Sequence, residues 1–194
     1  MFNLQWITQL TQKIEGLSTQ QTFFYWLASK YYHGVVKKEI ELARITKEDN
    51  ILCIGGGLCP FSAVLLHQKT GAKVTVIDNN EACAQKAQEV IERLELQHHV
   101  TVLCEDGTDL DFPLTSFSVV HLALQVSPME QVFAQVKAQA TPGTKILVRR
   151  PRKCLNKMYC QWSNSLIQCC QQIFHKKMRN IGSTQMYVKK ERIV

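Results

Sequence analysis

Three consecutive glycines followed by an aspartate form the pattern in this sequence that is best suited to binding a ligand. Gly55, Gly56 and Gly57 directly follow the apolar run Ile51–Ile54, and Asp78 closes a second apolar run. Glycines let the backbone turn sharply and approach a ligand closely. In nucleotide-binding half-sheets, an acid about 20 residues after such a turn accepts hydrogen bonds from ribose hydroxyls. The pattern therefore predicts strand, glycine turn, helix and strand around a nucleoside.

The residues after the glycines argue against a bound pyrophosphate. A pyrophosphate needs a third, later glycine and the free amides of a helix N-terminus. Here Cys59 and Pro60 occupy that place, and Pro60 lacks an amide donor although it suits the first turn of a helix. A nucleoside without phosphate, such as S-adenosylmethionine (SAM), therefore fits better than NAD or FAD. The alternative is a doubly wound domain with a tight turn and no ligand.

Further candidates for the cofactor site follow the second and third predicted strands. Asn79 comes directly after Asp78, and Asp106 and Gly107 come directly after the apolar run Val100–Cys104. Because parallel strands bring their carboxyl ends to one edge of the sheet, we expect these residues to lie near the glycine turn. Asp106 either accepts a hydrogen bond from an adenine amino group or serves as a turn acid.

The remaining patterns complete an α/β chain. They predict an amphipathic helix from residue 79 to 96, strands at 117–126 and 145–148, a helix at 156–174 and two strands after residue 178. This order indicates a Rossmann-like parallel sheet with helices on both faces and an antiparallel C-terminal strand. We divide the chain into an N-terminal helical extension or lid at 1–46 and a SAM-binding domain at 47–194. The extension is predicted to contain a helix at 3–17 and one or two helices at 22–42.

Composition narrows the class of protein. The chain has 194 residues, 45% of them hydrophobic and 20% charged, which is ordinary for a globular protein. The N-terminus has no cationic segment before an apolar core, and no apolar run is long enough to span a bilayer. We therefore expect a cytoplasmic protein with no membrane partner, whose eight cysteines are reduced. No C-x-x-C pair occurs, so we expect no metal.

The net charge of +7 is concentrated at the C-terminal end. From Lys145 onward there are twelve Lys or Arg and one acidic residue, whereas the residues before it include eleven Lys or Arg and fifteen Asp or Glu. A basic third of this kind either meets an anion such as RNA or forms a solvated surface, and the second interpretation is favoured.

Four segments in register resemble the nicotianamine synthases, within the class I SAM-dependent methyltransferases. That family reads I/V-G-S-G-P-L-P-L-T-S at the glycine turn, where this chain has 54–63. Its F-L-A-A-L-V-G-M resembles 121–129, and its A-P-G-A-L-L-M-L-R-S is similar to 141–150. The family also has Asn-Tyr followed seven residues later by a glutamate, and Tyr32 and Glu39 stand at that spacing.

The resemblance implies a fold, a donor and a set of site residues. Nicotianamine synthases use SAM as a donor of its 3-amino-3-carboxypropyl group to an amine. The resemblance thus implies Tyr32 and Glu39 as catalytic residues beside the predicted SAM site. The family takes a catalytic glutamate from a longer N-terminal helical domain, whereas the first acid here is Glu15. The general base is therefore expected to be missing or relocated. Its candidates are Tyr32, His33, Glu39 and His121, with His121 favoured as a structural histidine.

Three functions remain open from the sequence. The first is a SAM-dependent transferase acting on a small-molecule nucleophile, by methyl or aminocarboxypropyl transfer. The second is an RNA methyltransferase that uses the basic C-terminal third. The third is a non-catalytic SAM-binding module. A homodimer is possible, because the aromatic N-terminal stretch predicts an exposed apolar patch.

Overall fold

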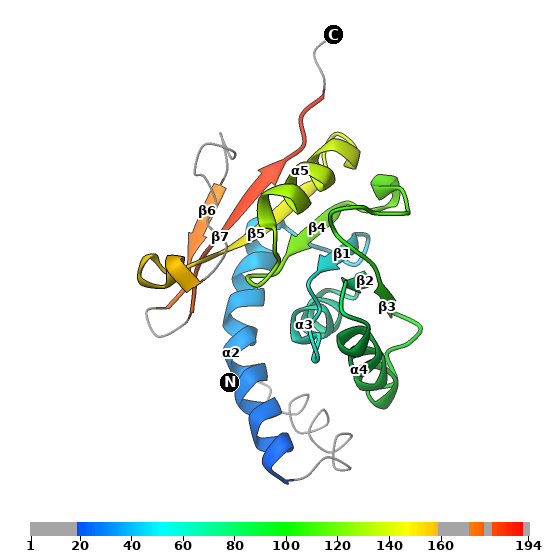
Figure 1. The fold of residues 1–194 in the computed structure, drawn as a ribbon, viewed down its shortest axis with the longest axis vertical. Coiled ribbons are helices and arrows are strands. Elements are labelled where there is room, and N and C mark those ends of the chain that lie inside the picture. Colours follow the sequence, from blue (N-terminus) through cyan, green and yellow to red (C-terminus); the bar gives the residue numbers. More distant parts are fainter. Residues whose placement is uncertain (1–18, 159–170, 177–179, 192–194) are drawn as a thin grey trace.

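The computed structural model describes residues 19–158, 171–176 and 180–191, which form a seven-stranded sheet with helices packed against it (Figure 1). The strand order is β3-β2-β1-β4-β5-β7-β6. The strands are β1 (Asn50–Ile54), β2 (Lys73–Asp78), β3 (Val100–Cys104), β4 (Val119–Leu122), β5 (Lys145–Pro151), β6 (Gln171–Phe174) and β7 (Ile181–Val188). The helices are α2 (Thr19–Ala43), α3 (Phe61–Thr70), α4 (Glu81–Arg93) and α5 (Met129–Gln139), with 3₁₀ turns η1 (Leu114–Ser116) and η2 (Lys153–Met158).

The first five strands are all parallel, and β7 and β6 extend the sheet beyond them. β1 pairs with β2 on one side and β4 on the other, so the chain reverses its direction of winding between β1 and β4. β7 pairs antiparallel with both β5 and β6. This confirms the predicted Rossmann-like fold. In such sheets a ligand binds at the carboxyl ends of the strands where the winding reverses.

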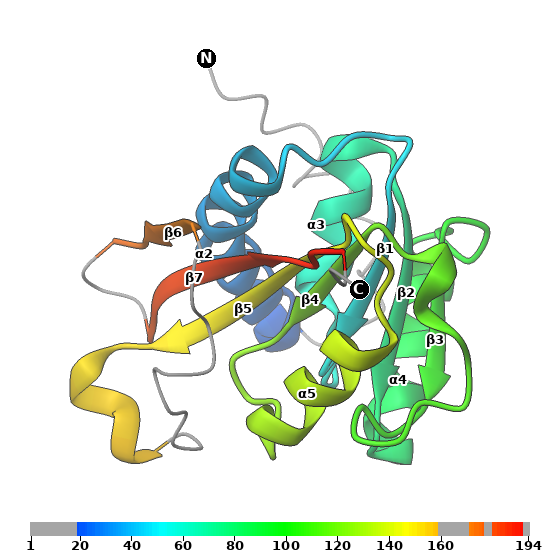
Figure 2. The same ribbon diagram turned by 90° about the horizontal axis from the view of Figure 1, so that it is seen from above.

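Helices lie on both faces of the sheet (Figure 2), and successive residues of a strand point to opposite faces. Ile51 and Cys53 belong to a core cluster that includes side chains of α2, α3 and α4. Leu52 and Ile54 belong to a second cluster, formed with α5 and η1. Parallel strands covered on both faces need a nearly continuous apolar sequence. Residues 51–54 of β1 and all of β4 except His121 provide it. The prediction of helices on both faces is confirmed.

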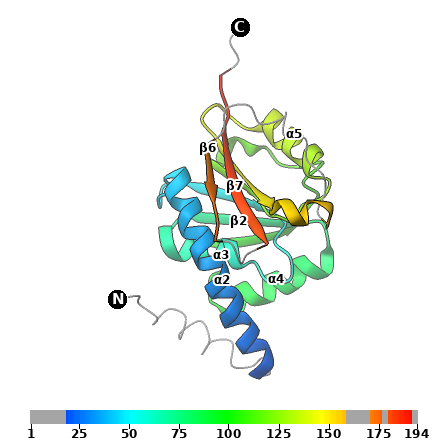
Figure 3. The ribbon, with the colours of Figure 1, turned by 90° about the vertical axis from the view of Figure 1, so that its left-hand side faces the viewer.

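The C-terminal region differs from the prediction. Residues 171–174, predicted as the end of a helix, form strand β6. Where two strands were predicted after residue 178, the described residues 180–191 form one strand, β7. Figure 3 shows β6 and β7 as the outer strands, with α2 nearby. Lys38 Nζ donates a 2.7 Å hydrogen bond to the carbonyl of Phe174, so α2 contacts the edge strand. The predicted helix at 3–17 lies outside the described residues.

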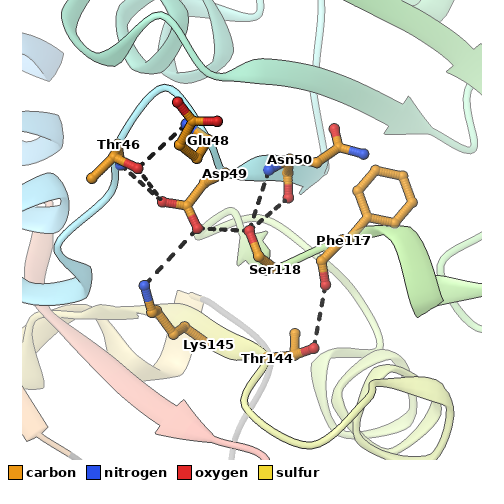
Figure 4. Close-up of polar contacts among 8 residues, drawn as sticks. All are labelled: Thr46, Glu48, Asp49, Asn50, Phe117, Ser118, Thr144 and Lys145. Carbon is orange, nitrogen blue, oxygen red and sulfur yellow. Dashed lines mark hydrogen bonds and ion pairs between the residues drawn. The ribbon is translucent and has the colours of Figure 1, made fainter.

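A polar cluster joins three segments at the amino ends of the strands (Figure 4). Asp49 Oδ1 accepts a 2.7 Å hydrogen bond from Ser118 Oγ, and its Oδ2 accepts one of 2.8 Å from the Thr46 amide. Lys145 Nζ lies 4.0 Å from Asp49 Oδ1. These contacts tie the starts of β1, β4 and β5 together, at the end of the sheet opposite to the expected site.

No helix in the described part of the chain is both long and apolar enough to cross a membrane.

We predict that Ile51→Ala destabilises the protein far more than Leu103→Ala. Ile51 is fully buried in the central strand, so its truncation should lower the free energy of unfolding by about 2–5 kcal/mol. Leu103 lies in edge strand β3 and is 37% exposed, so its truncation should cost about 1 kcal/mol or less. Urea unfolding of both variants measures the difference. Equal costs would contradict the central position of β1 in the core.

Candidate functional site

Two cavities meet at the carboxyl ends of the parallel strands. The acidic cavity, of about 360 Å³, is lined by residues 54, 55, 57, 77–79, 83, 105–107, 125–127 and 132. The aromatic cavity, of about 380 Å³, is lined by residues 32, 53–63, 76, 121, 123–125, 149, 180 and 181. Both cavities are lined by Ile54, Gly55, Gly57 and Gln125. The glycine turn is therefore a wall that the two cavities share.

The glycine turn has the geometry that only glycines give. Gly55 and Gly57 have positive φ angles of 86° and 60°. A Cβ on Gly56 would lie 2.4 Å from Val76 Cγ1, so packing against β2 excludes any side chain there. A Cβ on Gly57 would have no heavy atom within 4 Å. The backbone at Gly57 is thus strained for other residues and leaves open space in which a ligand can approach it.

Asp78 connects β2 to this turn. Its Oδ2 accepts a 2.7 Å hydrogen bond from the Gly57 amide, and its Oδ1 accepts one of 3.1 Å from the Asn80 amide. The described lining of the acidic cavity also contains Glu105 and Asp106, and it includes no basic side chain. Such a lining suits hydroxyl and amino donors or a cation, and it repels a phosphate. The residues therefore fit a nucleoside with a positive charge and without phosphate.

Aromatic rings and one cation form the other cavity. Tyr32, from α2, stacks on Phe61 with ring centroids 5.8 Å apart. The guanidinium of Arg149 lies 5.4 Å from the centroid of the Tyr32 ring. Arg149 is the one charged side chain among the described residues that line this cavity. It comes from the carboxyl end of β5, so α2, α3 and β5 together shape the aromatic cavity.

A buried ion pair lies directly behind the aromatic cavity. Arg149 donates from Nε to Glu39 Oε1 at 2.9 Å and from a terminal nitrogen to Glu39 Oε2 at 2.8 Å. Its other terminal nitrogen donates to Ser62 Oγ at 2.8 Å. Thr184 donates to Glu39 Oε1 at 2.7 Å, and His121 Nε2 lies 3.4 Å from Glu39 Oε2. Glu39 itself is fully buried.

The protonation states in this cluster follow from burial and from the ion pair. Burial alone would raise the pKa of the Glu39 carboxyl, but Arg149 outweighs it and holds that pKa well below its usual range. Burial, reinforced by the charge of Arg149, lowers the pKa of His121. Burial raises the pKa of the Cys53 thiol to about 12. At neutral pH the cluster therefore contains an ionised Glu39–Arg149 pair beside a neutral imidazole and a neutral thiol.

The predicted site residues divide between the two cavities. Asp78, Asn79, Asp106 and Gly107 line the acidic cavity, Gly56, Pro60 and Tyr32 line the aromatic cavity, and Gly55 and Gly57 line both. Glu39 does not belong to the described lining of either cavity. Pro60 caps the N-terminus of α3, one position before the first turn where the sequence suggested it.

Sequence reasoning missed Arg149 and Gln125 as lining residues. Arg149 did carry a signal, because it directly follows the buried run Ile146–Val148 in the sequence of β5. A charge in such a run requires an acid nearby in the fold. Gln125 had no comparable signal, since it is exposed and lies in a loop.

Residues 51–143 match the model of a family described as a methyltransferase domain. In sequence the chain is similar to L-histidine 2-aminobutanoyltransferase of Yersinia pestis, with 26% identity over 118 residues, which cover 61% of this chain and 43% of that protein. The chain thus spans less than half the length of this curated relative.

Two solved structures share the fold. A mutant of MtNAS, a nicotianamine synthase, in complex with SAM has a TM-score of 0.75 and 22% identity, and the match covers 97% of this chain and 73% of that one. An RNA methyltransferase from Salinibacter ruber in complex with S-adenosylhomocysteine has a TM-score of 0.62 and 17% identity, and the match covers 83% of this chain and 94% of that one.

We predict that Glu39→Gln destabilises the protein at pH 7 by about 3–5 kcal/mol, because it leaves the Arg149 charge buried without its counter-ion. The depressed pKa of Glu39 means that its contribution is complete above about pH 4.5 and is lost as the pH falls further. The difference between wild type and variant in urea unfolding should therefore shrink below pH 4.5.

The control for this prediction is Glu41→Gln on the same helix. Glu41 is 62% exposed and lies 3.9 Å from Lys37. An exposed pair of this kind contributes little, so its loss should change stability by about 1 kcal/mol or less. A Glu39→Gln variant as stable as Glu41→Gln at pH 7 would show that the buried pair does not hold α2 to β5.

Proposed function

We propose that this chain binds SAM and transfers a group from it to a small-molecule nucleophile. The premise is that the chain has the class I SAM-dependent methyltransferase fold and resembles the nicotianamine synthases. The observation that carries the proposal is the meeting of two unlike cavities at the glycine turn. One cavity is lined with acids and the other with aromatic rings and a cation. A donor and an acceptor in adjacent cavities would have their reacting atoms at the shared wall.

In this proposal the acidic cavity holds the adenosine part of SAM. Asp78 accepts from the ribose hydroxyls, Asp106 from the adenine amino group, and the backbone of Gly55 and Gly57 passes beside the sulfonium. SAM is consumed as a substrate and supplies an electrophilic carbon next to its positive sulfur. The chain's own contribution is to align this carbon with the nucleophile and to exclude water. Alignment of this kind can account for about 7–11 kcal/mol of a barrier.

We further propose that the transferred group is 3-amino-3-carboxypropyl and that the acceptor is an amine. The name of the Yersinia pestis relative describes transfer of a 2-aminobutanoyl group to L-histidine. The nicotianamine synthases, which the sequence resembles, transfer the aminocarboxypropyl group of SAM to an amine. The acceptor would occupy the aromatic cavity, with Tyr32 in contact with it. Glu39 acts in this proposal as a positioning residue, because it touches Arg149 and not the cavity.

The nucleoside released from SAM tests the function directly. The protein is incubated with SAM and a panel of amines and amino acids, and the products are separated by mass spectrometry. Methylthioadenosine is the expected product, because it remains when the aminocarboxypropyl group leaves. Release of S-adenosylhomocysteine would instead mean methyl transfer. The acceptor would be RNA if this product appears only when RNA is added, and a small molecule otherwise. SAM binding with neither product would mean a binding module.

We predict that Gly57→Ala weakens SAM binding at least tenfold while the protein stays folded. The added methyl group would enter the open space beside the turn, and the positive φ of 60° costs about 1–2 kcal/mol in stability. The matched control is Gly143→Ala, which has a φ of 91°, equal open space and no part in the described lining of either cavity. Calorimetric titration with SAM should separate the two variants, and equal affinities would argue against binding at the turn.

A further inference from the structure

SAM ends in an amino-acid group, and the α-carboxylate of that group needs hydrogen-bond donors. If the acidic cavity holds the adenosine part, as proposed above, the carboxylate cannot turn back into that cavity. Asp78, Glu105 and Asp106 line it, and its described lining includes no basic side chain. Like charges placed this close oppose binding. The carboxylate must therefore extend from the shared wall into the aromatic cavity.

The glycine turn between the two cavities cannot supply the donors. The amides of Gly55 and Gly56 both donate to the Ile77 carbonyl, at 2.9 and 3.2 Å. The amide of Gly57 donates to Asp78 Oδ2 at 2.7 Å. Each glycine amide of the turn is thus used within the fold. A carboxylate beside the turn has to find its donors farther inside the aromatic cavity.

Ser62, in the first turn of α3, offers a donor in that cavity. It is half-buried and lines the aromatic cavity. Its Oγ accepts a 2.8 Å hydrogen bond from a terminal nitrogen of Arg149, so the hydroxyl hydrogen has to point elsewhere. No acceptor for this hydrogen is found among the described residues. By contrast, Thr70 at the other end of α3 donates its hydroxyl to the Leu66 carbonyl at 2.6 Å. The Ser62 hydroxyl therefore remains available to a ligand.

The surroundings of Ser62 favour an anionic group over a cation. The amides of Leu58 and Cys59, which also line the aromatic cavity, have no acceptor in the part of the chain that the structure describes. No aspartate or glutamate is among the described lining residues. Arg149 polarises the serine hydroxyl through their hydrogen bond, although Glu39 balances its charge. This end of the cavity thus offers donors and no charged acceptor, which suits a carboxylate.

We infer that Ser62 binds the α-carboxylate of SAM, with Arg149 as the residue that positions its hydroxyl. The hydroxyl donates to the carboxylate, and the serine oxygen still accepts from Arg149. A carboxylate held there fixes the far end of the aminocarboxypropyl group, which is the group that the proposed reaction transfers. This inference rests on the proposed function, which places the adenosine part of SAM in the acidic cavity.

A comparison of two ligands and two proteins tests this contact. Decarboxylated SAM keeps the sulfonium and the amine but lacks the carboxylate. Calorimetry gives the Kd of SAM and of decarboxylated SAM for wild type and for Ser62→Ala. Loss of a hydrogen bond to a charged group lowers affinity about tenfold or more. The preference for SAM over decarboxylated SAM should therefore fall about tenfold in Ser62→Ala. A general change to the site affects both ligands, so the preference isolates the carboxylate.

Thr70→Ala is the matched control. It removes a hydroxyl from the same helix, but Thr70 is absent from the described lining of both cavities. Its preference for SAM should equal that of wild type. An equal preference in wild type and Ser62→Ala would overturn the role of Ser62. A Ser62→Ala variant that binds SAM normally and only raises the KM of the amine would assign the contact to the acceptor and overturn the inference as stated.

Wild-type protein provides a second test that does not depend on the folding of a variant. Decarboxylated SAM has one more net positive charge than SAM, so the acidic cavity alone would favour it. Tighter binding of SAM is expected if donors hold its carboxylate. Tighter binding of decarboxylated SAM would overturn this inference and leave the proposed function standing. Wild-type protein that binds neither ligand would overturn the proposed function and this inference with it.

Discussion

The ion pair between Glu39 and Arg149 is the constraint on which the rest of the site depends. Two charges removed from water are tolerated only when each satisfies the other in good geometry, and here the contact is bidentate and supported by Ser62 and Thr184. The pair fixes α2 against β5 and thereby fixes the wall of the aromatic cavity. A purely apolar contact would fill the same space without fixing the direction of the guanidinium.

Much of the nucleoside side of the site is predictable because its determinants are local. Gly55–Gly57 and Asp78 lie within one strand–helix–strand unit, and the backbone of such a unit leaves few alternatives for their arrangement. The parallel order of the first five strands follows from the alternation of apolar runs and helical patterns. These parts of the prediction needed no knowledge of distant contacts. The division of the chain at residue 46 and the roles of the individual site residues remain predictions.

The acceptor side could not be predicted in the same way, because its determinants are far apart in sequence. Glu39 and Arg149 are separated by 110 positions, and no local pattern connects them. His121 looks structural when only its apolar strand is considered, and its relation to Glu39 emerges only when α2 packs on the sheet and brings the Glu39 carboxylate within 3.4 Å of the imidazole. Strand β6 was missed for a similar reason. The polar sequence Gln171–Gln172 has no strand pattern of its own and is ordered by pairing with β7.

The polar cluster at Asp49 has a practical consequence for handling the protein. It lies at the amino ends of the strands, so the turn beside it is as far from both cavities as the length of the sheet allows. The side chains of Lys47 and Glu48 in this turn are 77% and 81% exposed. A fluorophore or a surface tether attached there would leave the mouths of both cavities facing solution. Immobilised protein would thus remain open to small molecules from the opposite side.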